Sequence, residues 1–298
     1  MKTIWFLTLA LNIALVMSLI GEAMAVVNYE DLEFSVGDSW EFRNTDESGM
    51  NMAFSVEVTG EDKVQIDGIE YEVFIARGSG SIEEVGDIGS YELVLGSSNL
   101  EVTYYDAKNY NEGARKTIFE MSFQLQDTSD GTVYTFASYS ENTETIISGS
   151  RPYEISPGVT WSLTIKEVEA ETTLFSGGYI GDGEPETIWT NRTKTINYEC
   201  IGMKSVTVTA GTFETYEIKK TTLGEQGNYT LLYLSSTVKR DVKSVDYNTQ
   251  GEILSILELL SYDIKTIKNE DTPGFETVSI LLGLTTVLII IHSRKKFG

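Results

Sequence analysis

The chain has 298 residues, with 45 Asp and Glu, 22 Lys and Arg, one His and one Cys, and its formal net charge is −23. This excess of negative charge argues against nucleic acid as a partner, because attraction to the phosphate backbone depends on Lys and Arg. A single Cys allows neither an internal disulfide nor a Cys-based zinc site. Hydrophobic and aromatic shares of 41% and 11% predict a folded chain rather than a disordered one.

The N-terminus has the pattern of a secretory signal peptide. Lys2 precedes an apolar run from Ile4 to Ile20, and the small residues Ala23 and Ala25 follow it. A positive start, an apolar segment and a small-x-small exit mark a segment that is removed on export. We therefore predict a signal peptide over residues 1–25, with the following chain outside the cytoplasm; an uncleaved anchor is the alternative.

From Val26 to Thr272 the hydrophobic pattern has a period of two. Trp161, Leu163 and Ile165, for example, alternate with polar residues, which indicates strands with one face buried and one face in water. Clusters of Gly, Asp and Asn interrupt these runs and predict turns between them. We therefore predict a mainly β, antiparallel fold between an N-terminal signal helix and a C-terminal transmembrane helix.

The strands recur in the same order, which predicts two related β halves, residues 26–150 and 151–268. The landmarks that recur are Gly37–Trp40 and Gly158–Trp161, Val64–Tyr71 and Val206–Phe213, Tyr104–Asp106 and Leu232–Leu234, and Arg115–Ile118 and Val238–Arg240. This order of motifs resembles secreted domains of the lipoprotein-carrier type. The resemblance implies a duplicated β-sandwich or half-barrel whose concave sheet holds an apolar or extended ligand. The pattern leaves open whether the halves form one domain or two.

Residues with special chemistry are few between the two ends. The one histidine, His292, lies in the C-terminal segment, so Ser-His and Cys-His catalysis and His-zinc sites are excluded from the secreted part. Cys200 lies in an apolar strand pattern and is predicted to be a buried core residue. Two sequons predict N-glycan acceptors at Asn191 and Asn228.

Carboxylates are the abundant reactive groups. Glu167, Glu169 and Glu171 are spaced by two, so they share one face of a strand and repel one another unless they are solvated or bound to a cation. Calcium, which prefers oxygen ligands, is the only metal predicted, and its predicted ligands are Asp127, Asp130, Asp182 and Glu184. A glycan hydrolase, which needs two carboxylates at a suitable separation, would draw them from Glu167, Glu169, Asp182 and Glu184.

The C-terminus combines three features of membrane-attached proteins. A linker over residues 269–276 contains Pro273-Gly274-Phe275, and a transmembrane helix is predicted over residues 277–293, of which Thr277–Ile291 is free of charge and almost entirely apolar. The tail over residues 294–298 begins with three basic residues. Seventeen residues are at the lower limit for spanning a bilayer, and the basic end fits a cytoplasmic placement. Together these features resemble the PGF-CTERM sorting signal of archaeal surface proteins, in which an archaeosortase cuts near the tripeptide and joins the new end to a membrane lipid.

The resemblance implies that the processing enzyme recognises Pro273, Gly274 and Phe275, and that Arg294, Lys295 and Lys296 retain the tail on the inner side of the membrane. A plain transmembrane anchor is the alternative.

The leading hypothesis is a secreted, membrane-anchored, non-enzymatic protein of the archaeal cell surface with a structural or binding role. Its predicted partners are the membrane, an archaeosortase-type enzyme, and surface-layer proteins or an apolar ligand. The alternatives are a lipid or apolar-ligand carrier and the carboxylate-dependent hydrolase. The negative charge is uneven, with −19 over Val26–Ser150 and −6 over Arg151–Phe275, which suits a solvated surface and cation binding.

Overall fold

The computed structural model describes residues 27–28, 32–47, 49–84, 91–94, 98–108, 113–176, 186–225 and 227–265. Within these residues, no helix has the length and hydropathy that a membrane crossing requires. The predicted signal peptide, the linker with its Pro-Gly-Phe tripeptide, the apolar segment and the basic tail all lie outside the described residues.

The described residues form strands that are joined mostly by short turns. In chain order the strands are β1 (Val27–Asn28), β2 (Ser39–Asp46), β3 (Asn51–Ile66), β4 (Ile69–Glu84), β5 (Tyr91–Leu93), β6 (Asn99–Ala107), β7 (Ala114–Asp127), β8 (Val133–Gly149), β9 (Glu154–Ile155), β10 (Thr160–Ser176), β11 (Glu186–Val208), β12 (Gly211–Thr222), β13 (Tyr229–Ser235), β14 (Arg240–Tyr247) and β15 (Ile253–Asp263).

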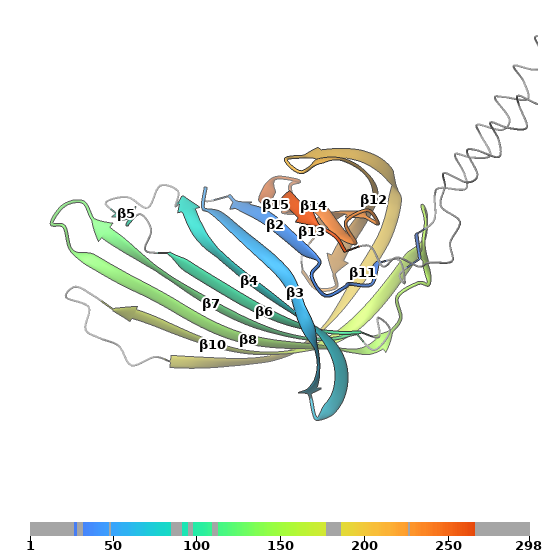
Figure 1. The fold of residues 1–298 in the computed structure, drawn as a ribbon, viewed down its shortest axis with the longest axis horizontal. Coiled ribbons are helices and arrows are strands. Elements are labelled where there is room, and N and C mark those ends of the chain that lie inside the picture. Colours follow the sequence, from blue (N-terminus) through green and yellow to red (C-terminus); the bar gives the residue numbers. More distant parts are fainter. Residues whose placement is uncertain are drawn as a thin grey trace, which may run out of the picture. The chain divides into compact units, whose positions relative to one another are not determined.

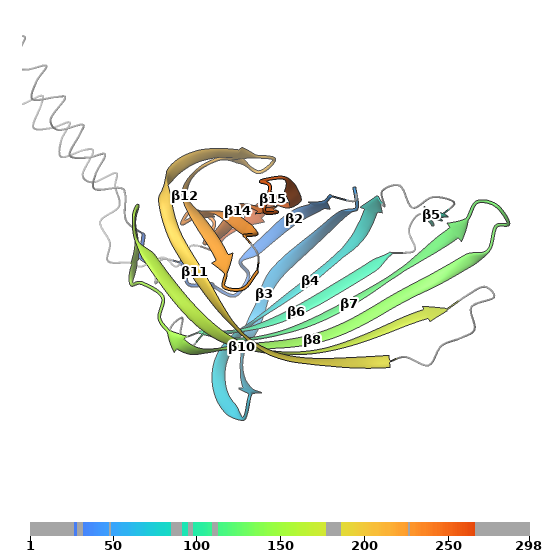
Figure 2. The same cartoon turned by 180° about the vertical axis from the view of Figure 1, so that it is seen from behind.

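Twelve of the described strands close into one barrel (Figures 1 and 2). The order around the barrel is β2-β3-β4-β6-β7-β8-β10-β11-β12-β13-β14-β15, and β15 pairs with β2 to complete the ring. Every pairing in the ring is antiparallel. β5 extends the far end of β7, and β1 pairs with β9 in a separate two-stranded sheet. Closure gives each barrel strand two hydrogen-bonded neighbours.

The expectation of a mainly antiparallel β fold is confirmed, but the halves form neither a sandwich nor an open half-barrel. The last strand of each half pairs with the first strand of the other, β8 with β10 and β15 with β2. Each six-stranded half by itself would expose two edge strands with unpaired backbone groups, and joining edge to edge pairs them. Local periodicity does not predict this closure, because it says nothing about which distant strands become neighbours.

Each half begins with the same turn. The N–H of Gly37 donates to the carbonyl of Val58 at 2.7 Å, and the N–H of Gly158 donates to the carbonyl of Cys200 at 2.8 Å. Both glycines have a positive φ, 93° and 88°, which glycine adopts without steric cost. Both acceptors precede a β-bulge in the second strand of their half, and a tight hairpin follows each bulge at the same distance. Three of the four predicted landmark pairs therefore occupy equivalent places in the two halves, whereas Arg115–Ile118 lies on β7 and Val238–Arg240 lies mostly in the turn before β14.

Apolar side chains, many from the first half, pack one side of the barrel interior. Trp40 and Phe42 on β2 are 2% exposed and belong to the largest buried cluster, together with residues of β3, β4, β6 and the second half. The Trp40 indole donates to the carbonyl of Val238 at 2.8 Å, which ties β2 to the β13–β14 turn. Gly78 on β4 lets the strands approach closely, because a Cβ there would lie 2.6 Å from both the Ser55 carbonyl and the Val102 side chain.

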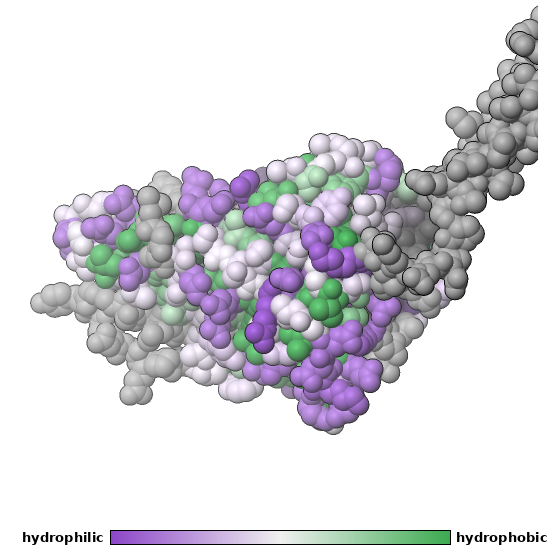
Figure 3. Space-filling model, in the orientation of Figure 1, coloured by the Kyte–Doolittle hydropathy of each residue, from purple (hydrophilic) through white to green (hydrophobic). Residues whose placement is uncertain are grey.

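The β3–β4 hairpin projects below the barrel and carries a hydrophilic surface (Figure 3). Glu61, Asp62, Lys63 and Glu70 on this hairpin are exposed. At its tip, Asp67 forms an ion pair of 2.6 Å with Lys166 on β10. Exposed pairs of this kind contribute little to stability, so the hairpin mainly adds to the acidic outer surface of the first half.

Candidate binding site

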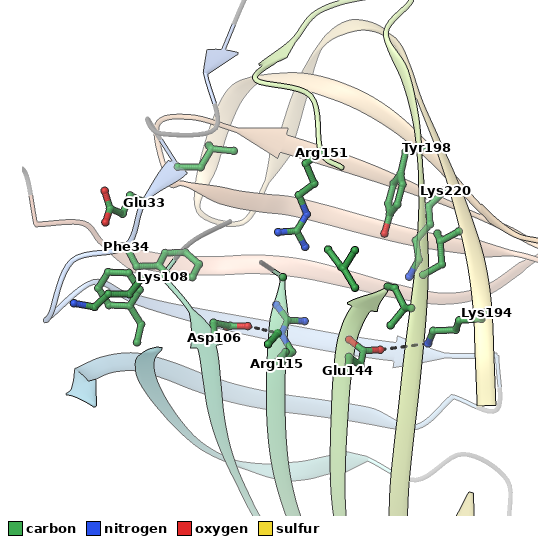
Figure 4. Close-up of a pocket in the computed structure, with 17 residues that line it drawn as sticks. Glu33, Phe34, Asp106, Lys108, Arg115, Glu144, Arg151, Lys194, Tyr198 and Lys220 are labelled. Atoms are coloured by element: carbon green, nitrogen blue, oxygen red, sulfur yellow. Dashed lines mark hydrogen bonds and ion pairs between the residues drawn. The ribbon is translucent and has the colours of Figure 1, made fainter. Parts of the chain in front are cut away.

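A cavity of about 210 Å³ lies inside the barrel, with strands of both halves around it (Figure 4). Apolar and aromatic side chains such as Phe34, Phe74 and Ile165 form part of its lining. The charged residues of the lining are Glu33, Asp106, Lys108, Arg115, Glu144, Arg151, Lys194 and Lys220. A second cavity of about 310 Å³ shares Lys194, Ile196 and Lys220 with the first. The second cavity lies at the lower end of the volume range of ordinary ligand pockets, about 300–1,000 Å³, and the first is somewhat smaller.

Cross-strand pairing places three charged groups side by side on one wall. Arg115 on β7 pairs with Asp106 on β6 and with Glu144 on β8, and direct partners point to the same face. The Arg115 Nε donates to Asp106 Oδ1 at 2.5 Å, and attraction to this carboxylate raises the pKa of Arg115. The Lys194 ammonium group donates to Glu144 Oε1 at 3.3 Å. This wall is therefore a row of mutually paired charges.

Three polar groups point toward that row from the other side of the cavity (Figure 4). They are the guanidinium of Arg151, which follows β8, the hydroxyl of Tyr198 on β11 and the ammonium group of Lys220 on β12. Tyr198 and Lys220 are direct partners on adjacent strands. Burial raises the pKa of Tyr198, so its phenol keeps its proton and is able to donate a hydrogen bond.

The lining reverses the charge balance of the chain. It contains five lysines and arginines but three acids, whereas the whole chain contains 22 and 45. Charges in a partly desolvated interior interact more strongly than charges on the surface, because the local dielectric is lower. The lining by itself therefore carries an excess of positive charge, which Glu61 and Glu167 outside the lining reduce through ion pairs with Lys108 and Lys194.

Arg240 brings a further cation against the aromatic side of the cavity. Its guanidinium carbon lies 4.8 Å from the ring centroid of Trp40, 5.3 Å from that of Phe42 and 6.0 Å from that of Phe34. Burial lowers the pKa of Arg240. Burial also raises the pKa of the adjacent Asp241 to about 6, although attraction to nearby cations opposes this shift.

The first carboxylate of the predicted row on β10 is neutralised by cations. The Glu167 side chain is 5% exposed and accepts hydrogen bonds from Arg192 Nε at 2.5 Å, from Asn142 Nδ2 at 3.1 Å and from Lys194, whose Nζ lies 3.1 Å away. Burial by itself would raise the pKa of Glu167, but the two cations outweigh it and lower the pKa to about 2. Glu167 is therefore ionised at neutral pH and has no proton to donate as a general acid.

The other two carboxylates of the row are less enclosed. The Ser140 hydroxyl lies 3.4 Å from Glu169 Oε1, within hydrogen-bond range, while Glu171, two residues further along β10, is exposed. The row is thus held by two cations at Glu167 and solvated at Glu171, which are the two ways of relieving the repulsion that the spacing predicts.

The predicted calcium ligands that the structure describes are used within a turn. Asp127 Oδ1 accepts from the N–H of Ser129 at 2.8 Å, and Asp130 Oδ1 accepts from the N–H of Thr132 at 2.8 Å. Hydrogen bonding to Thr132 lowers the pKa of Asp130. Within the described part of the chain, no group of three or more His, Cys, Asp or Glu side chains is placed to hold a metal ion. The other two candidates, Asp182 and Glu184, lie outside the described residues, so calcium there stays a prediction.

The remaining predicted residues lie at the surface or in the core. Cys200 is fully buried, and burial raises its pKa. Asn191 is exposed on β11, and Asn228 is exposed beside the second cavity, between β12 and β13. Both asparagines are thus accessible, as a glycan acceptor requires.

Sequence reasoning misses the cations of the cavity, although it contains a signal for them. Lys194 lies two residues before Ile196, and Lys220 lies two residues after Ile218. Ile196 and Ile218 are both buried, so the period of two places the lysines on the inner face as well. A cation in register with buried apolar residues is the pattern that indicates an interior charge.

Comparisons of the chain with protein-family models, with curated proteins and with solved structures find no match. The function of the cavity is therefore inferred from its own geometry and charge.

Proposed function

We propose that the protein is a non-enzymatic binding protein of the archaeal cell surface, which holds a small ligand inside its barrel. The observation that carries this proposal is the interior cavity, in which cations, a tyrosine hydroxyl and apolar side chains surround open space. Ligand pockets are usually concave sites that combine apolar side chains with a few converging polar groups, and this cavity has both kinds of group, with a larger share of charged residues. A barrel stabilised by its core alone has no need of so many interior cations, since each costs desolvation energy.

Native mass spectrometry of the full-length protein, extracted from membranes, tests the binding function. We expect one small molecule per chain that stays with the folded protein and leaves when the protein is unfolded. A protein that carries no such molecule, and whose thermal midpoint does not respond to a panel of small organic anions and amphiphiles, would contradict the proposal.

An apolar-ligand carrier is the second candidate, and the inner face of β7 favours it. Phe119 and Phe123 follow Arg115 at even spacing, so all three side chains share one face. Phe123 also stacks in a tilted arrangement on Phe136 of β8, with ring centroids 4.9 Å apart. An apolar ligand would contact this aromatic surface. A hydrolase is a weaker candidate, because Glu167 is ionised by its two cations and is unsuited to be the general acid.

We propose that the C-terminal segment attaches the barrel to the membrane. The support is the order of Pro273-Gly274-Phe275, a 17-residue apolar segment and a basic tail. The mass of the mature C-terminal peptide decides between the two kinds of anchor. Processing by a sortase-like enzyme predicts a new, lipid-modified end near the tripeptide, whereas an intact end at Lys296-Phe297-Gly298 on membrane-extracted protein would leave a plain transmembrane anchor.

We infer that the barrel is a duplication of one six-stranded unit. The support is the repeated geometry: in each half a glycine with positive φ donates to a strand residue just before a bulge, and a hairpin follows at the same distance. Three such features in the same order are more than β propensity alone would produce. Separate expression of β2–β8 and β10–β15 tests this inference, since related six-stranded units should recombine into a barrel when mixed, and failure to associate would weaken it.

A further inference from the structure

We propose that the cavity binds the anionic group of its ligand, a carboxylate or a phosphate, between Lys220, Arg151 and Arg115. This assignment rests on the proposed binding function and specifies its ligand chemistry. The three side chains come from different parts of the chain, and their charged groups meet in the same cavity (Figure 4).

The cations of the cavity differ in how far they are already neutralised. Arg115 is paired with Asp106, and Lys194 lies between Glu144 and Glu167. Among the described residues, the Lys220 ammonium group has no carboxylate within 4 Å, and the ion pairs drawn in Figure 4 both belong to the opposite wall. Lys220 is therefore a cation of the cavity whose charge no described carboxylate neutralises by direct contact.

The lining has two more cations than anions, but ion pairs with residues outside the lining reduce this excess. Lys108 is paired with Glu61, and Lys194 is paired with Glu167. The positive charge of the lining is therefore offset at these two lysines, whereas Lys220 has no such partner among the described residues. The Arg115 side chain is 48% exposed and Lys220 is half-buried, so the cations of the cavity are partly solvated, but cations that share one cavity still repel one another. A bound anion offsets this repulsion, which gives anions a preference over neutral ligands of the same shape.

The donors are also of the right kind for an oxyanion. A guanidinium offers two parallel N–H groups that match a carboxylate or a phosphate, and an ammonium group offers a third donor. The Tyr198 hydroxyl faces the same space and adds a neutral donor. Phe34, Phe74 and Ile165 also line the cavity, so apolar side chains are present to contact an apolar part of the ligand.

Binding to the full-length protein in phosphatidylcholine nanodiscs tests the assignment, with hexyl phosphate, hexanol and inorganic phosphate as probes. The matched variants are Lys220→Met, which removes the interior charge, and Lys219→Met, which removes the neighbouring charge that lies over the Tyr229 ring. Because a hydrogen bond to a charged group is lost, we expect Lys220→Met to weaken hexyl phosphate binding by roughly tenfold or more. Lys219→Met should stay within about twofold of the wild type, and Lys220→Arg should retain binding.

The outcomes separate the possible failures. Binding of inorganic phosphate as tight as that of hexyl phosphate supports a free anion as the ligand, and binding of hexyl phosphate alone supports the head group of an amphiphile. Hexanol binding as tight as hexyl phosphate binding, or equal losses in Lys220→Met and Lys219→Met, would overturn the anion site while leaving a neutral-ligand barrel intact. No binding of any probe, together with no co-purified molecule, would overturn the proposed binding function itself.

Discussion

Replacing Glu167 with Gln should destabilise the barrel in a way that depends on pH. The Glu167 carboxylate is 5% exposed and is held by Arg192 and Lys194. Gln keeps the size of the side chain and its hydrogen bond with Asn142, but it removes the anion that Arg192 and Lys194 share, which leaves Lys194 with Glu144 alone. The loss should therefore come from charge and not from packing.

The pKa of Glu167 sets the size of the effect. The carboxyl titrates near 4.5 when it is free and at about 2 in the folded protein. Each unit of pKa shift corresponds to about 1.4 kcal/mol, so the ionised carboxylate contributes about 3 kcal/mol at pH 7. A depressed pKa gives stability that is present above the unfolded value and is lost as the pH falls through the folded value. The contribution should fall to about 1.4 kcal/mol at pH 3 and below about 0.5 kcal/mol at pH 2.

Urea unfolding followed by tryptophan fluorescence, at pH 7 and at pH 3, measures this contribution as the difference between the wild type and Glu167→Gln. Glu171→Gln is the matched control, because Glu171 is on the same strand and is exposed; its effect should stay below about 0.5 kcal/mol at both pH values. A Glu167→Gln loss that is equal at both pH values, or no larger than the loss in the control, would refute the argument that the cations hold Glu167 ionised.

Three further predictions follow from other parts of the barrel. Gly80→Ala should lower the free energy of unfolding by about 3 kcal/mol or prevent folding, because its Cβ would overlap the Ala53 carbonyl oxygen. Gly60→Ala is the control, because the new Cβ meets nothing within 4 Å. Equal unfolding midpoints of the two variants would contradict the close packing at Gly80. Cys200, fully buried and with its pKa raised by burial, should react with iodoacetamide only in urea, and fast alkylation of the native protein would show that the site opens. Burial raises the pKa of Asp241 from 3.8 to about 6, so the folded state binds more protons between these values and loses stability as the pH rises through them. Asp241→Asn should remove this loss of stability. The free energy of unfolding of the variant, relative to that of the wild type, should therefore rise by up to about 3 kcal/mol between pH 4 and pH 7.5. A difference in urea unfolding that does not depend on pH would contradict this prediction.

The strands and their inward faces are predictable from the sequence, because each depends on neighbours along the chain. Trp161, Leu163 and Ile165 alternate with polar residues in the sequence, and their side chains are buried or half-buried in the barrel. The landmarks Val64–Tyr71 and Val206–Phe213 also fall on equivalent hairpins, since the spacing from bulge to hairpin is a local property. Closure into a barrel depends on β8 pairing with β10 and β15 with β2, and no periodicity reports such a choice of partners.

The site is less predictable than the fold, for a physical reason. Carboxylates dominate the composition, so the sequence directs attention to Glu167 and its neighbours, but a carboxylate becomes useful or inert according to what faces it. The groups that face Glu167 are Arg192 on the adjacent strand and Lys194 two residues later. Only the register of β10 with β11, in which Glu167 is the direct partner of Arg192, shows that the carboxylate is neutralised.

Comparison of the two halves indicates whether Lys220 serves the fold or the site. Ile69 is the first residue of β4, and Gly211 is the first residue of β12. Gly78 and Lys220 lie the same number of residues after these starts, so they occupy equivalent positions in the two halves. A Cβ at Gly78 would lie 2.6 Å from the Ser55 carbonyl, which means that the first half closes its wall at this point with no side chain at all. The barrel strand therefore does not require a lysine here. The residues just before them, Arg77 and Lys219, are cationic in both halves. At the next position, the second half has the charged side chain of Lys220 where the first half has Gly78. An ammonium group in the barrel interior costs desolvation energy, and a bound anion is the physical reason that we propose for its presence.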